Sequence, residues 1–91
     1  MITKQDTGTL YYQTFNLHQL VHTKRTKTIC ELANLADNAD LDGNYAESAM
    51  LLNDIIVELE TLQIINPTCS LADSAQALAE ALMHRALGRE S

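Results

Sequence analysis

The chain has 91 residues, a length typical of one domain, and 46% of them are hydrophobic, the proportion of a folded rather than a disordered protein. No apolar run approaches the roughly 18 residues of a membrane span, and residues 1–10 lack the basic and apolar blocks of a secretory signal. The net charge of −6 argues against a protein that binds nucleic acid or anionic membranes. We therefore expect a single domain over residues 1–91.

The charges are distributed unevenly along the chain. No Lys or Arg occurs between Thr28 and His84, and the same span carries ten Asp and Glu. A short basic segment, His22–Lys27, precedes it. Because cations are missing from this span, the acids cannot form the usual ion pairs with residues three or four positions away on a helix. The sequence therefore predicts an anionic helical body that attracts cationic surfaces, although a charged face that only aids solubility is the simpler interpretation.

The first 23 residues give mixed signals. Thr, Tyr and Phe side chains at residues 9–15 favour a strand, whereas Asn16 followed by Gln19 is typical of a helix start. We predict a loose or extended lead-in over residues 1–15 and a short helix at about 17–23. If residues 9–15 form a strand instead, it would pair with a second copy of the chain or with a bound protein, because no other strand is indicated.

The next helix is predicted to begin at Thr28, which forms a capping-box pattern with Glu31. It would extend over about residues 28–41. The alternative is that the basic segment is an exposed turn of one longer helix. The sequence Asp42-Gly43-Asn44 then indicates a tight turn.

Two longer helices are predicted after this turn. Tyr45, Ala49, Leu52, Ile56 and Leu59 recur at steps of four and three, which places them on one face of a helix over about residues 44–65. Asn66-Pro67 ends that helix, because the residue before a proline is disfavoured in the helical conformation. Ser70 and Asp73 cap a last, Ala-rich helix that ends near Gly88, at about residues 70–87. The predicted fold is therefore an all-α, small antiparallel three-helix domain with an additional N-terminal segment, either a short helix or a strand.

No pattern in the sequence indicates catalysis, a cofactor or a metal. Cys30 and Cys69 are interpreted as reduced, mostly buried thiols of a cytoplasmic protein, although sequence alone does not exclude a bridge between them. His18 and His22 are four residues apart, but no Glu follows His18 as in a zinc-protease motif, so we favour two surface histidines. A pairing of Cys30 with His84 as nucleophile and base has no supporting pattern. We predict a protein that is not an enzyme.

One stretch of about 30 residues, within 29–60, resembles a tetratricopeptide repeat. Leu32, Leu35, Ala36 and Ala39 stand where that family has the packing residues of its first helix. The run Gly43-Asn44-Tyr45-Ala46-Glu47-Ser48 is similar to its Gly-Asp-Tyr-x-Glu-Ala, and Leu52 and Ile55 follow at later core positions. The sequence departs from the family in having Leu32 for an aromatic residue, Ser48 for Ala and Glu60 for a helix-ending Pro. It also contains a single unit, whereas a solenoid needs about three.

The same stretch resembles the microtubule-interacting and transport domain, a three-helix relative of that hairpin. The segment ADLDGNYAESAMLL is similar to that domain's first turn and the start of its second helix. Both families bind peptide segments of other proteins and have no enzymatic activity, so either resemblance implies a protein-binding function.

We predict a small acidic protein that acts by binding another protein, as an adaptor, a chaperone or a regulatory or inhibitory subunit. The alternative is a mimic of nucleic acid that inhibits a nucleic-acid-handling machine, in the manner of a phage-borne anti-defence protein. A DNA-binding regulator that uses His22–Lys27 is less favoured because the ten acids oppose it. The predicted partner is a protein with a basic or apolar groove, without direct contact to nucleic acid or membrane, and a homodimer is a further alternative. The candidate contact residues are Asp37, Asp40, Asp42, Glu47, Asp54, Glu58, Leu51, Ile55 and Leu62.

Overall fold

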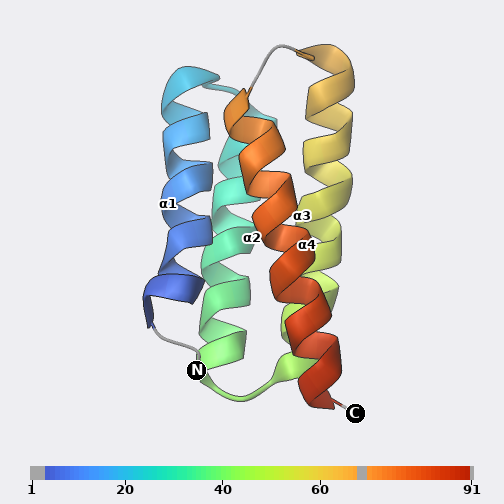
Figure 1. Cartoon of the computed structure of the whole chain (residues 1–91). Helices are drawn as coiled ribbons and strands as arrows, with labels where there is room; N and C mark the ends of the chain where they lie inside the picture. The colour runs from blue at the N-terminus through green and yellow to red at the C-terminus, as the bar shows by residue number, and fades with distance from the viewer. Residues whose placement is uncertain (1–3, 68–69, 91) are drawn as a thin grey trace.

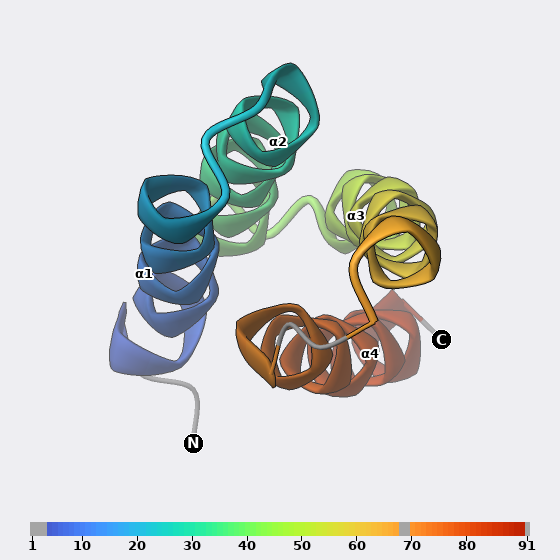
Figure 2. The same cartoon turned by 90° about the horizontal axis from the view of Figure 1, so that it is seen from above.

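The computed structural model describes residues 4–67 and 70–90, which form four helices: α1 (Lys4–Leu20), α2 (Lys24–Leu41), α3 (Tyr45–Ile65) and α4 (Ser70–Glu90). They run alternately up and down (Figure 1) and are arranged around one core, α1 against α2 and α4, and α3 against α2 and α4 (Figure 2). The prediction of an all-α fold is confirmed. The prediction of three helices with an additional N-terminal segment is matched in part, because that segment is a full-length helix, α1, and the described residues form a four-helix bundle.

Helix α1 includes residues that were predicted to be extended or to form a strand. Leu10, Thr14 and Leu17 recur at steps of four and three, and all three are fully buried against the neighbouring helices. The Thr14 hydroxyl donates hydrogen bonds to the carbonyl oxygens of Leu10 and Tyr11 at 3.0 and 2.9 Å, so a buried polar residue is satisfied within the helix. Burial of this face outweighs the β-propensity of the threonine and aromatic residues.

Helix α2 begins four residues earlier than predicted, and the cap is formed by threonines. The Thr23 hydroxyl accepts a hydrogen bond from the Thr26 backbone N–H at 3.2 Å, and the Thr26 hydroxyl accepts one from the Thr23 N–H at 3.1 Å. This reciprocal pair is a capping box made by two hydroxyl groups. The predicted cap at Thr28 and Glu31 is therefore wrong, and Lys24, the first helical residue, lies within the basic segment.

The turn between α2 and α3 has the predicted form. Gly43 has a φ of +80°, a left-handed conformation that glycine adopts without strain. The Gly43 and Asn44 N–H groups donate to the carbonyl oxygens of Asp40 and Ala39 at 3.1 and 2.9 Å, which satisfies the end of α2. The short turn places α2 and α3 side by side in opposite directions (Figure 1).

The core is built mainly from leucine and isoleucine on α1 and α3 and mainly from alanine on α2 and α4. Leu17 of α1, Ile29 of α2 and Ile55 and Leu59 of α3 are fully buried. Helix α4 contributes small side chains, with Ala72, Ala75 and Ala79 fully buried, and this allows it to approach α1 and α3 closely. Across the described ranges, no helix combines the length and the hydrophobicity that crossing a membrane requires.

Candidate protein-binding groove between α3 and α4

Three of the six acids predicted as contact residues are not free surface anions. Glu58 accepts two hydrogen bonds from Arg25 Nη1, at 3.2 and 3.3 Å, which join α3 to α2. Asp40 Oδ1 lies 3.6 Å from Arg89 Nη1, which joins α2 to α4. Asp37 is buried. The remaining three candidates, which are exposed, are Asp42, Glu47 and Asp54.

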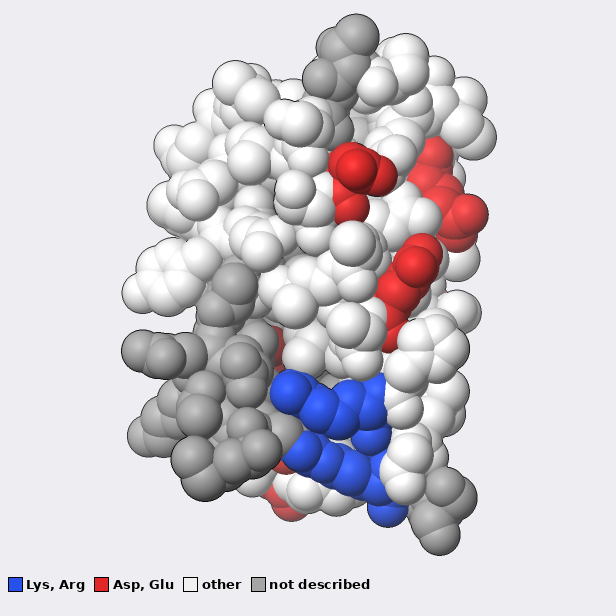
Figure 3. All heavy atoms as spheres, in the orientation of Figure 1, with Lys and Arg blue, Asp and Glu red and all other residues white. Residues whose placement is uncertain are grey.

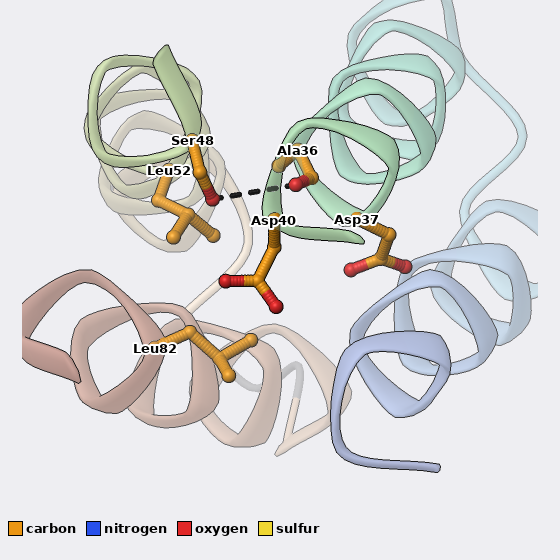
Figure 4. A pocket seen from close by; sticks show the side chains of 6 residues that line it. All are labelled: Ala36, Asp37, Asp40, Ser48, Leu52 and Leu82. Atoms are coloured by element: carbon orange, nitrogen blue, oxygen red, sulfur yellow. Dashed lines mark hydrogen bonds between the residues drawn. The ribbon is translucent and has the colours of Figure 1, made fainter. Parts of the chain in front are cut away.

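Asp37 and Asp40 line a small hollow between α2, α3 and α4 (Figure 4). Burial and, to a smaller extent, the nearby Asp40 carboxylate together raise the pKa of Asp37 from its ordinary 3.8 to about 7. On the α3 side, the Ser48 hydroxyl donates to the Ala36 carbonyl oxygen at 3.3 Å. The hollow has a volume of about 10 Å³, close to the space that one water molecule needs. It is therefore too small to hold an organic substrate.

The three apolar candidates belong largely to the core. Ile55 is 0% exposed and Leu62 is 3% exposed, while Leu51 is half-buried. Helix α3 lies between α2 and α4, so both flanks of its apolar stripe are covered within the chain (Figure 2). Ile55 and Leu62 stabilise the bundle and are not presented to a partner in this fold.

A different apolar surface lies open, on the outer side of the seam between α3 and α4. It is a groove of about 560 Å³, a size in the range of ligand and peptide sites. Met50 is 68% exposed and Leu87 is 49% exposed, and Met83 is half-buried between the two helices. The groove is lined by Ala46, Ala49, Met50, Asn53, Asp54, Met83 and Leu87.

Acidic side chains lie in this groove and beyond its upper end. Asp54 is part of the wall. Gln63 Nε2 donates to Gln76 Oε1 at 2.6 Å, a contact that fixes the register of α3 against α4. Glu60 on α3 and Glu80 on α4 each lie about one helical turn closer to the groove than this glutamine pair, and both are exposed. Figure 3 shows Asp and Glu side chains along the seam where α4 meets α3, whereas the Lys and Arg side chains on this face gather near the lower end of α4.

The basic segment forms a separate cationic surface at the turn between α1 and α2. His18, His22, Lys24 and Lys27 surround an open hollow of about 380 Å³ together with Thr23. The two histidine rings are stacked with their centroids 4.4 Å apart. Two lysines beside the histidine pair make the hollow unfavourable for a metal cation.

The described residues offer no other site for a metal ion, since no group of three or more His, Cys, Asp or Glu side chains comes together there. Cys30 is a buried free thiol, and Cys69 lies outside the described residues. That Cys69 is a reduced, mostly buried thiol therefore remains a prediction.

Sequence reasoning did not identify Met50, Met83 and Leu87 as site residues. The sequence could have indicated Met50, because it is an apolar residue that falls outside the core positions Ala49, Leu52 and Ile56 of the same helix and is therefore expected on the surface. No local signal indicates that Met83 and Leu87 lie opposite it, because their position depends on the packing of α4 against α3.

Comparison with known proteins finds no match to the chain among family models, curated proteins or solved structures. The functional interpretation depends on the geometry and charge of the surfaces described above.

Proposed function

We propose that this chain is a non-enzymatic protein of the cytoplasm that acts by binding a helical segment of another protein in the groove between α3 and α4. The observation that carries the proposal is the groove itself. Its exposed apolar side chains, Met50 and Leu87, are not needed to close the core, which is filled by other residues of the same helices. Apolar surface of this kind, rimmed by polar side chains, is typical of a protein interaction site.

The shape of the groove supports a helical segment as its occupant. Between Ala46 and Asp54 it follows α3 for about 12 Å, at 1.5 Å per residue, which matches about two turns of a helix. Two methionines contribute to its walls, and methionine adapts its flexible side chain to different apolar partners. Among the described residues there is no strand, so a partner cannot bind by adding a strand to a sheet edge.

A mimic of nucleic acid is a second candidate. It is supported by the exposed acids on α3 and α4 and by the absence of Lys and Arg between Thr28 and His84. It is weaker than the first, since Asp37 is buried and Glu58 and Asp40 are paired with arginines. An inhibitor of this kind would need a long row of unpaired acids to match the spacing of phosphates.

The test is photo-crosslinking in the native host with a crosslinking amino acid at position 50, and at exposed position 34 of α2 as the control. We expect one protein to be captured at position 50 and not at position 34. The purified partner should then bind Leu87→Glu at least about tenfold more weakly than the unmodified chain, because a charge is placed against apolar surface.

Leu35→Glu is the matched control, since Leu35 is 52% exposed but lies on α2. Unchanged thermal unfolding of both variants, followed by circular dichroism, will show that the bundle is intact. If the captured protein binds Leu87→Glu and Leu35→Glu equally well, the groove is not its binding site.

A further inference from the structure

We infer that the segment bound in the groove between α3 and α4 is a cationic amphipathic helix, with apolar residues on one face and Lys or Arg along its flanks. This inference rests on the proposed function, because it names the chemistry of the occupant of the same groove. It follows from where the acids and the apolar side chains lie in and around the groove, and from how the cations of the chain are placed.

The lower part of the groove is apolar. Met50 and Leu87 project from opposite helices, and Ala46 and Ala49 provide a shallow floor because their side chains are small. A Leu, Ile or Phe of a partner helix would fill the space above the alanines and contact the methionine. Apolar residues at steps of three and four on the partner helix would keep it in contact over two turns.

The upper part of the groove is negatively charged. Asp54 lies in the wall one turn above Met50, and Glu60 and Glu80 lie beyond it on α3 and α4. None of these three acids has a lysine or arginine three or four positions away in the sequence. The ion pairs found between described residues, Arg25–Glu58 and Arg89–Asp40, do not include them either, and Glu80 accepts a hydrogen bond from the neutral Gln76 Nε2 at 3.2 Å. A bound segment that carries Lys or Arg would complement these acids.

Arg89, near the C-terminal end of α4, is engaged in another contact. Arg89 lies 3.6 Å from Asp40 and over the ring of Tyr45 at 5.3 Å from its centroid. A cation held between a carboxylate and an aromatic ring is directed away from Asp54 and Glu80. The negative potential of the groove is thus not balanced by this side chain.

A second copy of this chain does not offer a suitable helix. Helix α1 exposes Tyr12 and Leu20 and α3 exposes Ile64, but residues 10–20 and 45–65 contain no Lys or Arg. The exposed apolar residues of α2 are Leu35 and Leu41, 52% and 56% exposed. Their exposed neighbours on α2, Asn34, Asn38 and Asp42, are neutral or acidic. Docking this helix into the groove of another copy would place Asp42 close to acids of like charge, which is unfavourable. The complementary charge therefore points to a different protein.

The inference can be tested with three synthetic 18-residue peptides that share one apolar face of leucines and differ on their flanks. One carries Lys, one carries Glu and one carries Gln at the same positions. Binding to the full chain is measured by calorimetry and by changes in the backbone amide NMR spectrum. We expect the Lys peptide to bind at least about tenfold more tightly than the Gln peptide, and the Glu peptide to bind least. The amides that shift should include those of Met50, Asp54, Met83 and Leu87.

Charge variants of the protein show whether the Lys peptide is attracted by the acids at the groove or only by the overall negative charge of the protein. The double variant Asp54→Lys with Glu80→Lys should weaken the Lys peptide at least about tenfold and strengthen the Glu peptide. The control Glu31→Lys changes an exposed acid on α2 and should leave both affinities within about twofold. Raising the salt from about 0.05 to 0.5 M should weaken the Lys peptide and leave the Gln peptide nearly unchanged.

The outcomes distinguish this inference from the proposed function. Equal binding of the Lys and Gln peptides in the groove overturns the inference about charge and leaves the groove as a protein-binding site. Failure of the Lys peptide to bind, or shifts confined to α1 and α2, also overturns it, and the crosslinking at position 50 then decides independently whether the groove binds a protein. A partner captured there with an acidic or uncharged helix would overturn the inference while supporting the function.

Discussion

Replacing Asp37 with Asn should remove much of the pH dependence of stability between pH 5 and pH 8. The Asp37 side chain is 9% exposed, and no described side chain of opposite charge is found in hydrogen-bond contact with it. Burial, together with a smaller contribution from the Asp40 carboxylate, raises its pKa to about 7. The folded protein therefore holds a proton that the unfolded chain releases near its ordinary pKa of 3.8.

The sign of the effect follows from this difference. Below pH 3.8 the carboxyl group is protonated in both states and does not affect the free energy of unfolding through its charge. As the pH rises from 3.8 to about 7, the unfolded state ionises first, so stability is lost at about 1.36 kcal/mol per pH unit. The total loss is about 4 kcal/mol, of which about 3 kcal/mol falls between pH 5 and pH 8. That is a large share of the roughly 5–14 kcal/mol expected for a domain of this size.

The measurement is urea unfolding at pH 5, 6, 7 and 8 for the unmodified chain, Asp37→Asn and the control Asp42→Asn. Asp42 is exposed at the end of the same helix, so its variant should follow the unmodified chain. Relative to both, the free energy of unfolding of Asp37→Asn should rise by about 3 kcal/mol between pH 5 and pH 8. If the three proteins instead lose stability in parallel over this range, Asp37 is not a buried protonated acid and the reasoning is refuted.

Three further predictions concern the start of α2, the turn before α3 and a glycine within α4. Thr26→Val should lower the free energy of unfolding by about 2–3 kcal/mol, because it removes one of the two hydrogen bonds of the α2 capping box and the hydrogen bond to the Val21 carbonyl oxygen at 2.6 Å. Exposed Thr28→Val should lower it by under about 0.5 kcal/mol in the same urea unfolding assay. Gly43→Ala should lower the free energy of unfolding by about 1 kcal/mol, because alanine is strained at the φ of +80° that Gly43 adopts. No steric clash adds to this loss, because an added methyl group would have no atom within 4 Å. Gly88→Ala, within α4, should stabilise by up to about 1 kcal/mol, and equal effects of the two glycine variants would contradict this account.

The sequence predicted α3 and α4 well because their signals are local and agree with one another. Predicted helices at about 44–65 and 70–87 correspond to Tyr45–Ile65 and Ser70–Glu90. The apolar period, the Gly43 turn and Pro67 all indicate the same boundaries. For α1 the local signals disagreed, and the buried row of Leu10, Thr14 and Leu17 gains its stability only from contact with α2 and α4. Tertiary packing of this kind is not readable from propensity.

The candidate site was harder to predict, since the state of each acid depends on residues distant in the sequence. Glu58 is paired with Arg25, 33 positions away, and Asp40 is paired with Arg89. Neither pair follows the helical spacing of three or four that sequence reasoning uses for ion pairs. The burial of Asp37 likewise depends on how other helices cover α2. The sequence therefore predicted that the body is acidic, but not which of its acids remain unpaired.

The two long-range ion pairs give the molecule an asymmetry that the net charge alone does not reveal. Arg25 is placed on the α2–α3 seam and Arg89 on the α2–α4 side, so each neutralises an acid where helices meet α2. Lys24 and Lys27 line the hollow at the α1–α2 turn. Three of these four cations lie on α2, and the fourth, Arg89 at the end of α4, is paired with Asp40 of α2, while Asp54, Glu60 and Glu80 lie on α3 and α4. A chain selected for solubility alone has no reason to separate its charges in this way, because interspersed charges of both signs serve that purpose. A binding surface for a cationic helix requires the separation, because cations along the α3–α4 seam would repel the ligand.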